Sequence, residues 1–244
     1  CSSDLPLVSP SVGDAPQSRA LVEKLLAPDS IRDIRAKAFA AKPAGVTAVF
    51  PDDNPFHESP MAATTHFLVA DAAGNIVCAT QSQSLHFGAG VVPPGTGVVM
   101  NDSMSNFAYT NPASVNYVAP GKRPRSSMAP AIVLDRQGRL VAALGSPGGN
   151  SILAYNLKTL VGVLDWKMSM QDAISLPNLI ARGPSYAAEP EKFAPGIVDG
   201  LAARGVKLVG GGGAEGSGLH GVLITPTGLT GGADPRREGV ARVP

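Results

Sequence analysis

Two pairs of apolar runs, each joined by a short polar turn, most restrict how this chain can fold. The first pair lies at residues 64–70 and 76–82, and the second lies at 131–134 and 140–144. Apolar runs of this length on either side of a glycine-containing turn are typical of β-hairpins. A long amphipathic helix is predicted from about 151 to 164. Hairpins interleaved with helices predict helical layers on antiparallel sheets, an α+β fold.

The remaining elements are shorter. Residues 42–63 contain proline and glycine breakers with few periodic apolar positions, which predicts a surface linker. Helices are predicted within 18–41 and near 169–175 and 195–204, and short strands at 97–100, 206–209 and 221–224.

Charge and hydropathy exclude two classes of partner. The 244 residues include 20 basic and 19 acidic side chains, a net charge of +1. Such a balance creates no strong field for nucleic acid or for an anionic membrane. No run approaches the length of about 18 apolar residues that a membrane-spanning helix needs. We therefore predict neither a nucleic-acid partner nor a membrane span.

Cysteine and histidine spacing predicts no metal site and no disulfide framework. The glycine loop at 210–213 lacks the strand–helix context of a phosphate-binding loop, so no nucleotide cofactor is predicted either. Cys1 is consistent with a lipidated mature terminus or with the point where a longer chain was cut, and no signal peptide is visible. The residues without metal-ligand spacing are Cys78, His57, His66, His86 and His220.

Thr64 stands where the linker ends and a predicted strand begins. A threonine hydroxyl is a poor nucleophile unless a base removes its proton, and the α-amine of an N-terminal threonine can be that base. This chemistry requires cleavage of the bond between Ala63 and Thr64. Alone, a threonine at the start of a strand is ordinary, so further motifs must support the hypothesis.

Six segments in a fixed order supply that support. Their order and spacing resemble those of the small subunit of the γ-glutamyltranspeptidases. The segments are Thr64–Phe67 with Asp71–Asn75, Phe87–Gly90, Asn101–Phe107, Lys122–Pro130, Gly145–Gly149 and Gly232–Arg236.

The resemblance implies a fold and a processing event. The fold of this family is the N-terminal-nucleophile hydrolase αββα sandwich, two antiparallel sheets between helical layers. Its members are precursors that cut themselves before the threonine. Residues 1–63 would then be the end of the large subunit and its linker, and residues 64–244 the catalytic small-subunit region. A large-subunit segment is expected upstream or as a separate chain, and the location implied is periplasmic or secreted.

Catalytic roles follow from the same resemblance. Thr64 would attack the amide carbonyl, and Ser82 stands where the family has a hydroxyl that hydrogen-bonds the nucleophile. The backbone N–H groups of Gly148 and Gly149 would stabilise the oxyanion. Without the resemblance, a tight turn into the helix is the simpler interpretation of these two glycines.

Five further residues match the family's substrate-binding positions. Ser126 and Ser127 match the serines that hold the α-carboxylate of the γ-glutamyl group. Asn106 replaces an acidic residue that pairs with the α-ammonium, and Ser103 and Ser84 replace Gln and Asn. A neutral amide makes a hydrogen bond to an ammonium about half as strong as a carboxylate does. All three changes weaken ammonium recognition and suggest a different acyl group.

The prediction is a self-processing N-terminal-threonine amidohydrolase or acyltransferase that cleaves γ-glutamyl or related acyl amides through an acyl-enzyme, without metal or cofactor. One alternative is an acylase for glutaryl or cephalosporin-type amides. The other is a non-catalytic family member that binds a ligand, against which the presence of Thr64, Ser82, Gly148 and Gly149 argues.

Overall fold

The computed structural model divides the chain into two compact units, which we describe separately. Unit 1 comprises residues 1–58, 103–126 and 181–210, and unit 2 comprises 59–102, 127–180 and 211–244. The structure describes residues 12–38, 62–182, 185–210 and 216–242.

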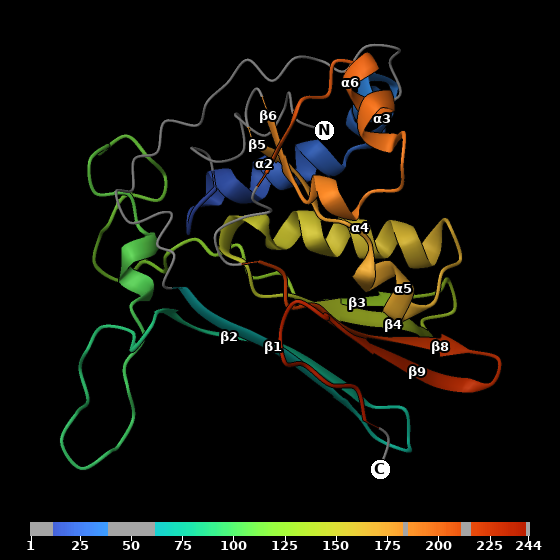
Figure 1. Cartoon of the computed structure of the whole chain (residues 1–244). Helices are drawn as coiled ribbons and strands as arrows, with labels where there is room; N and C mark the ends of the chain where they lie inside the picture. Colours follow the sequence, from blue (N-terminus) through green and yellow to red (C-terminus); the bar gives the residue numbers. More distant parts are fainter. Residues whose placement is uncertain (1–11, 39–61, 183–184, 211–215, 243–244) are drawn as a thin grey trace. The chain divides into compact units, whose positions relative to one another are not determined.

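Unit 2 is built on a four-stranded antiparallel sheet in the order β3-β4-β8-β9. Two helices, α4 (Ile152–Leu164) and α5 (Met170–Ser175), pack on one face of this sheet (Figure 1). On the other face, the hairpin of β1 (Ala62–Ala70) and β2 (Ile76–Leu85) contacts β4 and β8. The sheet strands are β3 (Ala131–Leu134), β4 (Leu140–Gly145), β8 (His220–Thr225) and β9 (Gly228–Ala233).

The burial of β4 explains why these layers assemble. Successive strand residues point to opposite faces, and yet Ala142, Ala143 and Leu144 are all fully buried. This strand is therefore covered on both faces, by the helices and by the hairpin. The hairpin itself alternates, since His66 points into the unit while Phe67 and Val69 remain exposed.

Helix α5 begins with a side-chain cap. The Ser169 hydroxyl accepts a hydrogen bond from the backbone N–H of Asp172 at 3.1 Å and donates to its carboxylate at 2.7 Å. Such a capping pair satisfies a backbone donor that the helix leaves open. It places the apolar face of the helix, Met170 and Ile174, in the core of unit 2.

Unit 1 combines short helices with a small sheet. A single residue, Asn116, organises its long loop, because its buried side chain donates to the Asn106 carbonyl at 2.7 Å and accepts from the Arg125 amide at 3.0 Å. In the sheet, whose order is β5-β6-β7, strands β6 and β7 pair in parallel. The elements are α2 (Pro16–Leu26), α3 (Pro28–Ala38), η2 (Ser103–Asn106), β6 (Ser185–Ala188), η4 (Pro190–Lys192), α6 (Ile197–Ala203), β7 (Leu208–Gly210) and β5 (Leu179–Arg182), which begins in unit 2.

The predicted strand at 97–100 is wrong. Met100 donates to the Val91 carbonyl and accepts from the Ala89 amide, so this segment closes the loop after β2 instead of joining a sheet. The predicted linker also extended too far, because Ala62 and Ala63 belong to β1. The rest of that linker at 42–61, together with Cys1 and His57, lies outside the described residues.

Three strands were missed: β5, β6 and β9. The last has the sequence Gly-Leu-Thr-Gly-Gly-Ala, which has neither the β-branched content nor the alternation that identifies a strand. None of the helices that the structure describes has the length and apolar character that a bilayer span requires.

Candidate active site

The nucleophile predicted from sequence lies beside the predicted second hydroxyl. Thr64 and Ser82 are partners in the β1–β2 ladder, and their side-chain oxygens are 2.8 Å apart. The Ser82 hydroxyl also donates to the carbonyl of Ala63 at 3.3 Å and accepts from the backbone N–H of Ser84 at 2.9 Å. One hydroxyl thus contacts both the predicted nucleophile and the carbonyl of the bond at which cleavage is predicted.

A β-bulge lies at this same point. The register shifts between Ala63 and Thr64, because Ala63 pairs with Ser84 while Thr64 pairs with Ser82. The additional residue on β2 is Gln83, and Ser84 has a φ of 69°. A positive φ is uncommon for residues other than glycine. Bulges of this kind redirect side chains and are frequent beside active sites.

The loop that follows β4 carries the two predicted oxyanion donors. Gly148 has a φ of 126°, and a Cβ there would lie 2.5 Å from Cε2 of Tyr155. Only glycine combines this backbone angle with so close an approach. Gly149, with a φ of 53°, begins the 3-10 helix η3 (Gly149–Ser151), which leads into α4. The positive end of the α4 dipole therefore lies at this loop.

A series of contacts connects this loop to Thr64. The guanidinium of Arg237 approaches the carbonyl oxygens of Thr64 and Gly216, each at 3.5 Å. A Cβ on Gly148 would lie 3.3 Å from that same Gly216 oxygen. Unit 2 therefore brings together the start of β1 with Thr64, the segment before β8, and the loop at 146–149 that carries the predicted oxyanion donors, called the oxyanion loop below.

His66 lies two residues after Thr64 on the buried face of β1. Its Nδ1 is 2.8 Å from the Thr80 hydroxyl, and its Nε2 is 3.6 Å from the thiol of Cys78. Burial, with a smaller contribution from the charge of His220, lowers the pKa of His66 to about 4. The ring packs where a Cβ on Gly145 would lie 2.3 Å from it. His66 is thus a neutral, packed side chain near neutral pH.

The closing motif is an internal anchor of unit 2. Burial raises the pKa of the Asp234 carboxyl, but hydrogen bonds from Ser217 and from the backbone and guanidinium of Arg236 outweigh this effect and hold it below its usual value. Arg236 forms an ion pair with Asp234 at 3.0 Å and donates to the Leu176 carbonyl at the end of α5. The motif therefore fastens the C-terminal segment to the helix layer.

The predicted substrate-binding residues divide between the two units. In unit 2, the Ser127 hydroxyl donates to the carbonyl of Gly149 at 2.8 Å, and Ser84 lies at the bulge beside Ser82. In unit 1, Ser103 and Asn106 are the ends of η2, and Ser126 is exposed. The place of these three relative to Thr64 remains a prediction from the sequence.

Sequence reasoning missed two residues of this neighbourhood, Ser146 and Arg237. Ser146 lies within the segment Gly145–Gly149 and Arg237 directly follows Gly232–Arg236, so their positions in these motifs were the available signal. Ser146 is fully buried and bonds to the loop carbonyl of Pro147. Their place in the site depends on contacts between residues far apart in the sequence, from Gly218 to Ser146 and from Arg237 to Thr64.

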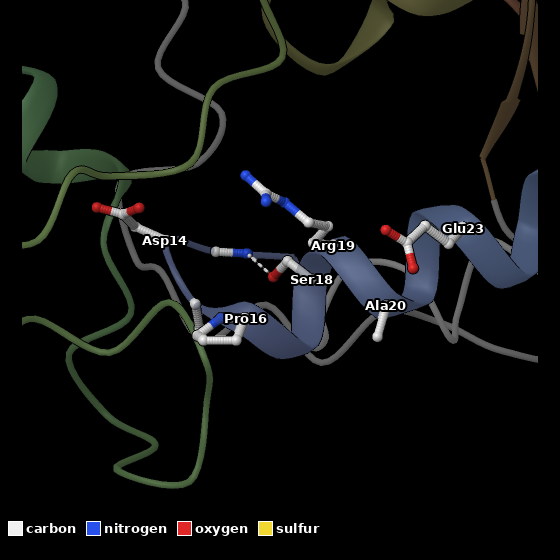
Figure 2. Close-up of a pocket in the computed structure, with 8 residues that line it drawn as sticks. Asp14, Pro16, Ser18, Arg19, Ala20 and Glu23 are labelled. Carbon is white, nitrogen blue, oxygen red and sulfur yellow. Dashed lines mark hydrogen bonds between the residues drawn. The ribbon is translucent and has the colours of Figure 1, made fainter.

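Two other features do not point to the site. In the part of the chain that the structure describes, no group of three His, Cys, Asp or Glu side chains could hold a metal ion. An open cavity of about 620 Å³ lies in unit 1 at the start of α2 (Figure 2). Its lining contains none of the predicted site residues, and the polar side chains in it are Asp14, Ser18, Arg19 and Glu23.

Comparison with known proteins agrees with the motifs. The family model for gamma-glutamyltranspeptidase matches residues 9–243. An acylase ACY 1 proenzyme from Pseudomonas sp. (strain V22) is 40% identical over 72% of this chain and 31% of its own length. A glutathione hydrolase proenzyme from Pseudomonas sp. (strain A14) is 33% identical over 75% of this chain and 33% of its own length.

A solved structure extends the similarity. The crystal structure of a cephalosporin acylase from Bacillus halodurans superposes with a TM-score of 0.72 and 26% identity, over 90% of this chain and 39% of that one. The chain spans about a third of the length of the two curated relatives. Its fold is that of the N-terminal-nucleophile hydrolases of this family. The chain belongs to the γ-glutamyltranspeptidase family.

Proposed function

We propose that this chain is the catalytic part of a self-processing amidohydrolase or acyltransferase whose nucleophile is Thr64. The observation that carries the proposal is the position of the Ser82 hydroxyl, 2.8 Å from Oγ1 of Thr64 and 3.3 Å from the carbonyl oxygen of Ala63. In this position Ser82 can hydrogen-bond both the attacking oxygen of Thr64 and the carbonyl oxygen of the peptide bond that Thr64 would attack.

The first reaction is cleavage of the chain itself. Oγ1 of Thr64 attacks the carbonyl carbon of Ala63, while Ser82 accepts a hydrogen bond from the nucleophile and donates one to the carbonyl oxygen. The C–N bond then breaks, its nitrogen takes up the proton, and an ester joins Ala63 to the Thr64 side chain. Water hydrolyses this ester, which releases the Ala63 carboxylate and leaves Thr64 with a free α-amine.

The second reaction is turnover of an external amide. The α-amine has an ordinary pKa of about 8, so it can take the proton from Oγ1 as the hydroxyl attacks the substrate carbonyl. The N–H groups of Gly148 and Gly149 bind the oxyanion, and removal of one such donor typically lowers kcat by about 10²–10³-fold. The amine returns the proton to the leaving nitrogen, and water or another amine then accepts the acyl group.

The substrate we propose is an acyl amide of the γ-glutamyl type or a close analogue without the α-ammonium. Asn106 is neutral where the family has an acid, and Ser103 and Ser84 are shortened relative to the family's Gln and Asn. A specific observation favours an acylase as the second candidate: identity is 40% to the acylase and 33% to the glutathione hydrolase.

The companion we propose is a large-subunit segment, upstream in the precursor or as a separate chain. Two observations support it. The curated relatives are about three times as long as the matched region. The outer face of the β1–β2 hairpin also leaves Phe67, Val69 and Val77 exposed, and further sheet or helix from the companion would cover them.

Processing is the sharpest test. A full-length precursor should yield a fragment that begins Thr64-Thr65-His66 on N-terminal sequencing. Thr64→Ala should abolish the cut and all amide hydrolysis, and Thr64→Ser should retain part of both. Thr65→Ala is the matched control, since Thr65 is the next residue but faces solvent. A wild-type precursor that remains whole yet hydrolyses amides would disprove the free-amine mechanism, and one that does neither would favour the binding-protein alternative.

A further inference from the structure

We propose that Ser146 is a positioning residue for the oxyanion hole. The inference rests on the proposed function and assigns a role to a residue that the mechanism above does not use. Ser146 precedes Pro147 and Gly148 in the loop after β4, and its side chain is fully buried.

Both hydrogen-bonding functions of this hydroxyl are occupied. It donates to the carbonyl oxygen of Pro147 at 2.6 Å and accepts from the backbone N–H of Gly218 at 3.2 Å. Gly218 belongs to the segment before β8, where a Cβ would lie 2.7 Å from side-chain carbons of both Arg237 and Pro147. The hydroxyl therefore ties the oxyanion loop to the segment that Arg237 links to Thr64.

The peptide between Pro147 and Gly148 transmits this restraint. A trans peptide is planar, so its N–H points opposite to its C=O, and the described chain contains no cis peptide. A hydrogen bond that fixes the Pro147 oxygen therefore also fixes the direction of the Gly148 N–H. This N–H is one of the two proposed oxyanion donors.

The neighbouring peptides are restrained in other ways. The Gly148 oxygen accepts from the backbone N–H of Ser151 at 2.9 Å, which aims the Gly149 N–H. The Gly149 oxygen accepts from the N–H of Ile152 and from the Ser127 hydroxyl. Because the first turn of the helix holds the Gly149 donor, the Gly148 donor is the one that a side chain controls.

The backbone at Gly148 makes this control necessary. At a φ of 126°, glycine has no Cβ to limit rotation of the preceding peptide. Without the Ser146 hydroxyl, the Pro147–Gly148 peptide can rotate and its N–H can leave the oxyanion position. The loss should appear in the transition state, where the charge develops, and hardly in substrate binding.

The test compares two buried serines in the processed, full-length enzyme. Ser146→Ala removes the proposed restraint. Ser217→Ala is the matched control, because Ser217 is also fully buried, and its hydroxyl bonds to Asn178 at 2.9 Å and to the Asp234 carboxylate instead of to the loop after β4. The assay measures kcat and KM on glutaryl-p-nitroanilide and γ-glutamyl-p-nitroanilide, with rates normalised to the amount of Thr64 N-terminus found by mass spectrometry.

We expect Ser146→Ala to lower kcat by about tenfold or more on both substrates with KM changed less than about twofold, since a misdirected donor loses part of the 10²–10³-fold effect of a deleted one. Ser217→Ala should lose stability but keep kcat within about twofold of the wild type. If Ser146→Ala fails to fold or process, Ser146→Cys, which keeps a weak donor, should show a smaller loss confined to kcat.

Two results would overturn the inference while the wild type remains active: equal kcat in the two alanine variants, or a Ser146 defect confined to KM. If Ser146→Ala fails to fold or process and Ser146→Cys is tested in its place, a kcat of Ser146→Cys equal to that of the wild type would also overturn the inference. A wild type that neither processes nor hydrolyses either substrate overturns the proposed function, and this inference with it.

Discussion

Acidification should destabilise the fold through His66. Burial and the nearby His220 lower its pKa from the ordinary value of 6.5 to about 4. Each unit of pKa difference between folded and unfolded chain corresponds to about 1.36 kcal/mol. Since the side chain is 2% exposed, solvent screens little of this cost. Charging the buried imidazole should therefore cost the folded state about 3 kcal/mol.

The sign follows from proton uptake. Between pH 6.5 and about 4, the unfolded chain has a protonated His66 while the folded chain still has a neutral one. The unfolded state binds more protons in this window, so stability falls as the pH falls. Above pH 6.5 the full stability is present, and below about pH 4 the loss through His66 is complete.

Urea denaturation at a series of pH values measures this effect. On acidification through this window, the free energy of unfolding of the wild type should fall by about 3 kcal/mol more than that of His66→Gln. The carboxylates titrate alike in both proteins, so their contribution cancels in this comparison. His86→Gln is the matched control, since it removes a histidine whose side chain is exposed, and it should follow the wild-type curve. If wild type and His66→Gln run parallel from neutral pH to about pH 4, burial of a neutral imidazole does not explain acid sensitivity.

Three further predictions concern the loop, the closing motif and the substrate. Gly148→Ala should lower the free energy of unfolding in urea by about 2 kcal/mol or more and abolish turnover, because its Cβ would lie 2.5 Å from the Tyr155 ring at a φ of 126°; wild-type stability would contradict the strained geometry. Asp234→Ala should cost about 3–5 kcal/mol in the same assay, because Arg236, 11% exposed, loses its buried carboxylate; a loss below about 1 kcal/mol, the range of a surface pair, would contradict the anchoring role. Asn106→Asp should raise the ratio of kcat/KM for γ-glutamyl-p-nitroanilide to kcat/KM for glutaryl-p-nitroanilide by at least about tenfold, which corresponds to ~1.4 kcal/mol. A wild type that already prefers the γ-glutamyl compound, with no gain in the mutant, would show that Asn106 does not set acyl specificity.

Much of unit 2 could be predicted from the sequence because its signals are local. The β1–β2 hairpin has apolar runs on either side of a glycine turn, and β3 was predicted with the same bounds, Ala131–Leu134. Helix α4 lies within one residue of its predicted start. The contact between Thr64 and Ser82 was expected from the resemblance to the family, and the register of the hairpin places the two residues opposite each other.

Only the tertiary structure determines what depends on contacts between distant segments. The bulge at Ala63 has no sequence signature, and the glycine-rich β9 is a strand only because β8 pairs with it. The neutral state of His66 requires the packing of β1 against Gly145 of β4, and the direction of the Gly148 N–H depends on a hydroxyl held by Gly218, 72 residues away. Propensity and periodicity describe neighbours along the chain, whereas burial and hydrogen bonding at this site arise between elements that meet only when the chain has folded.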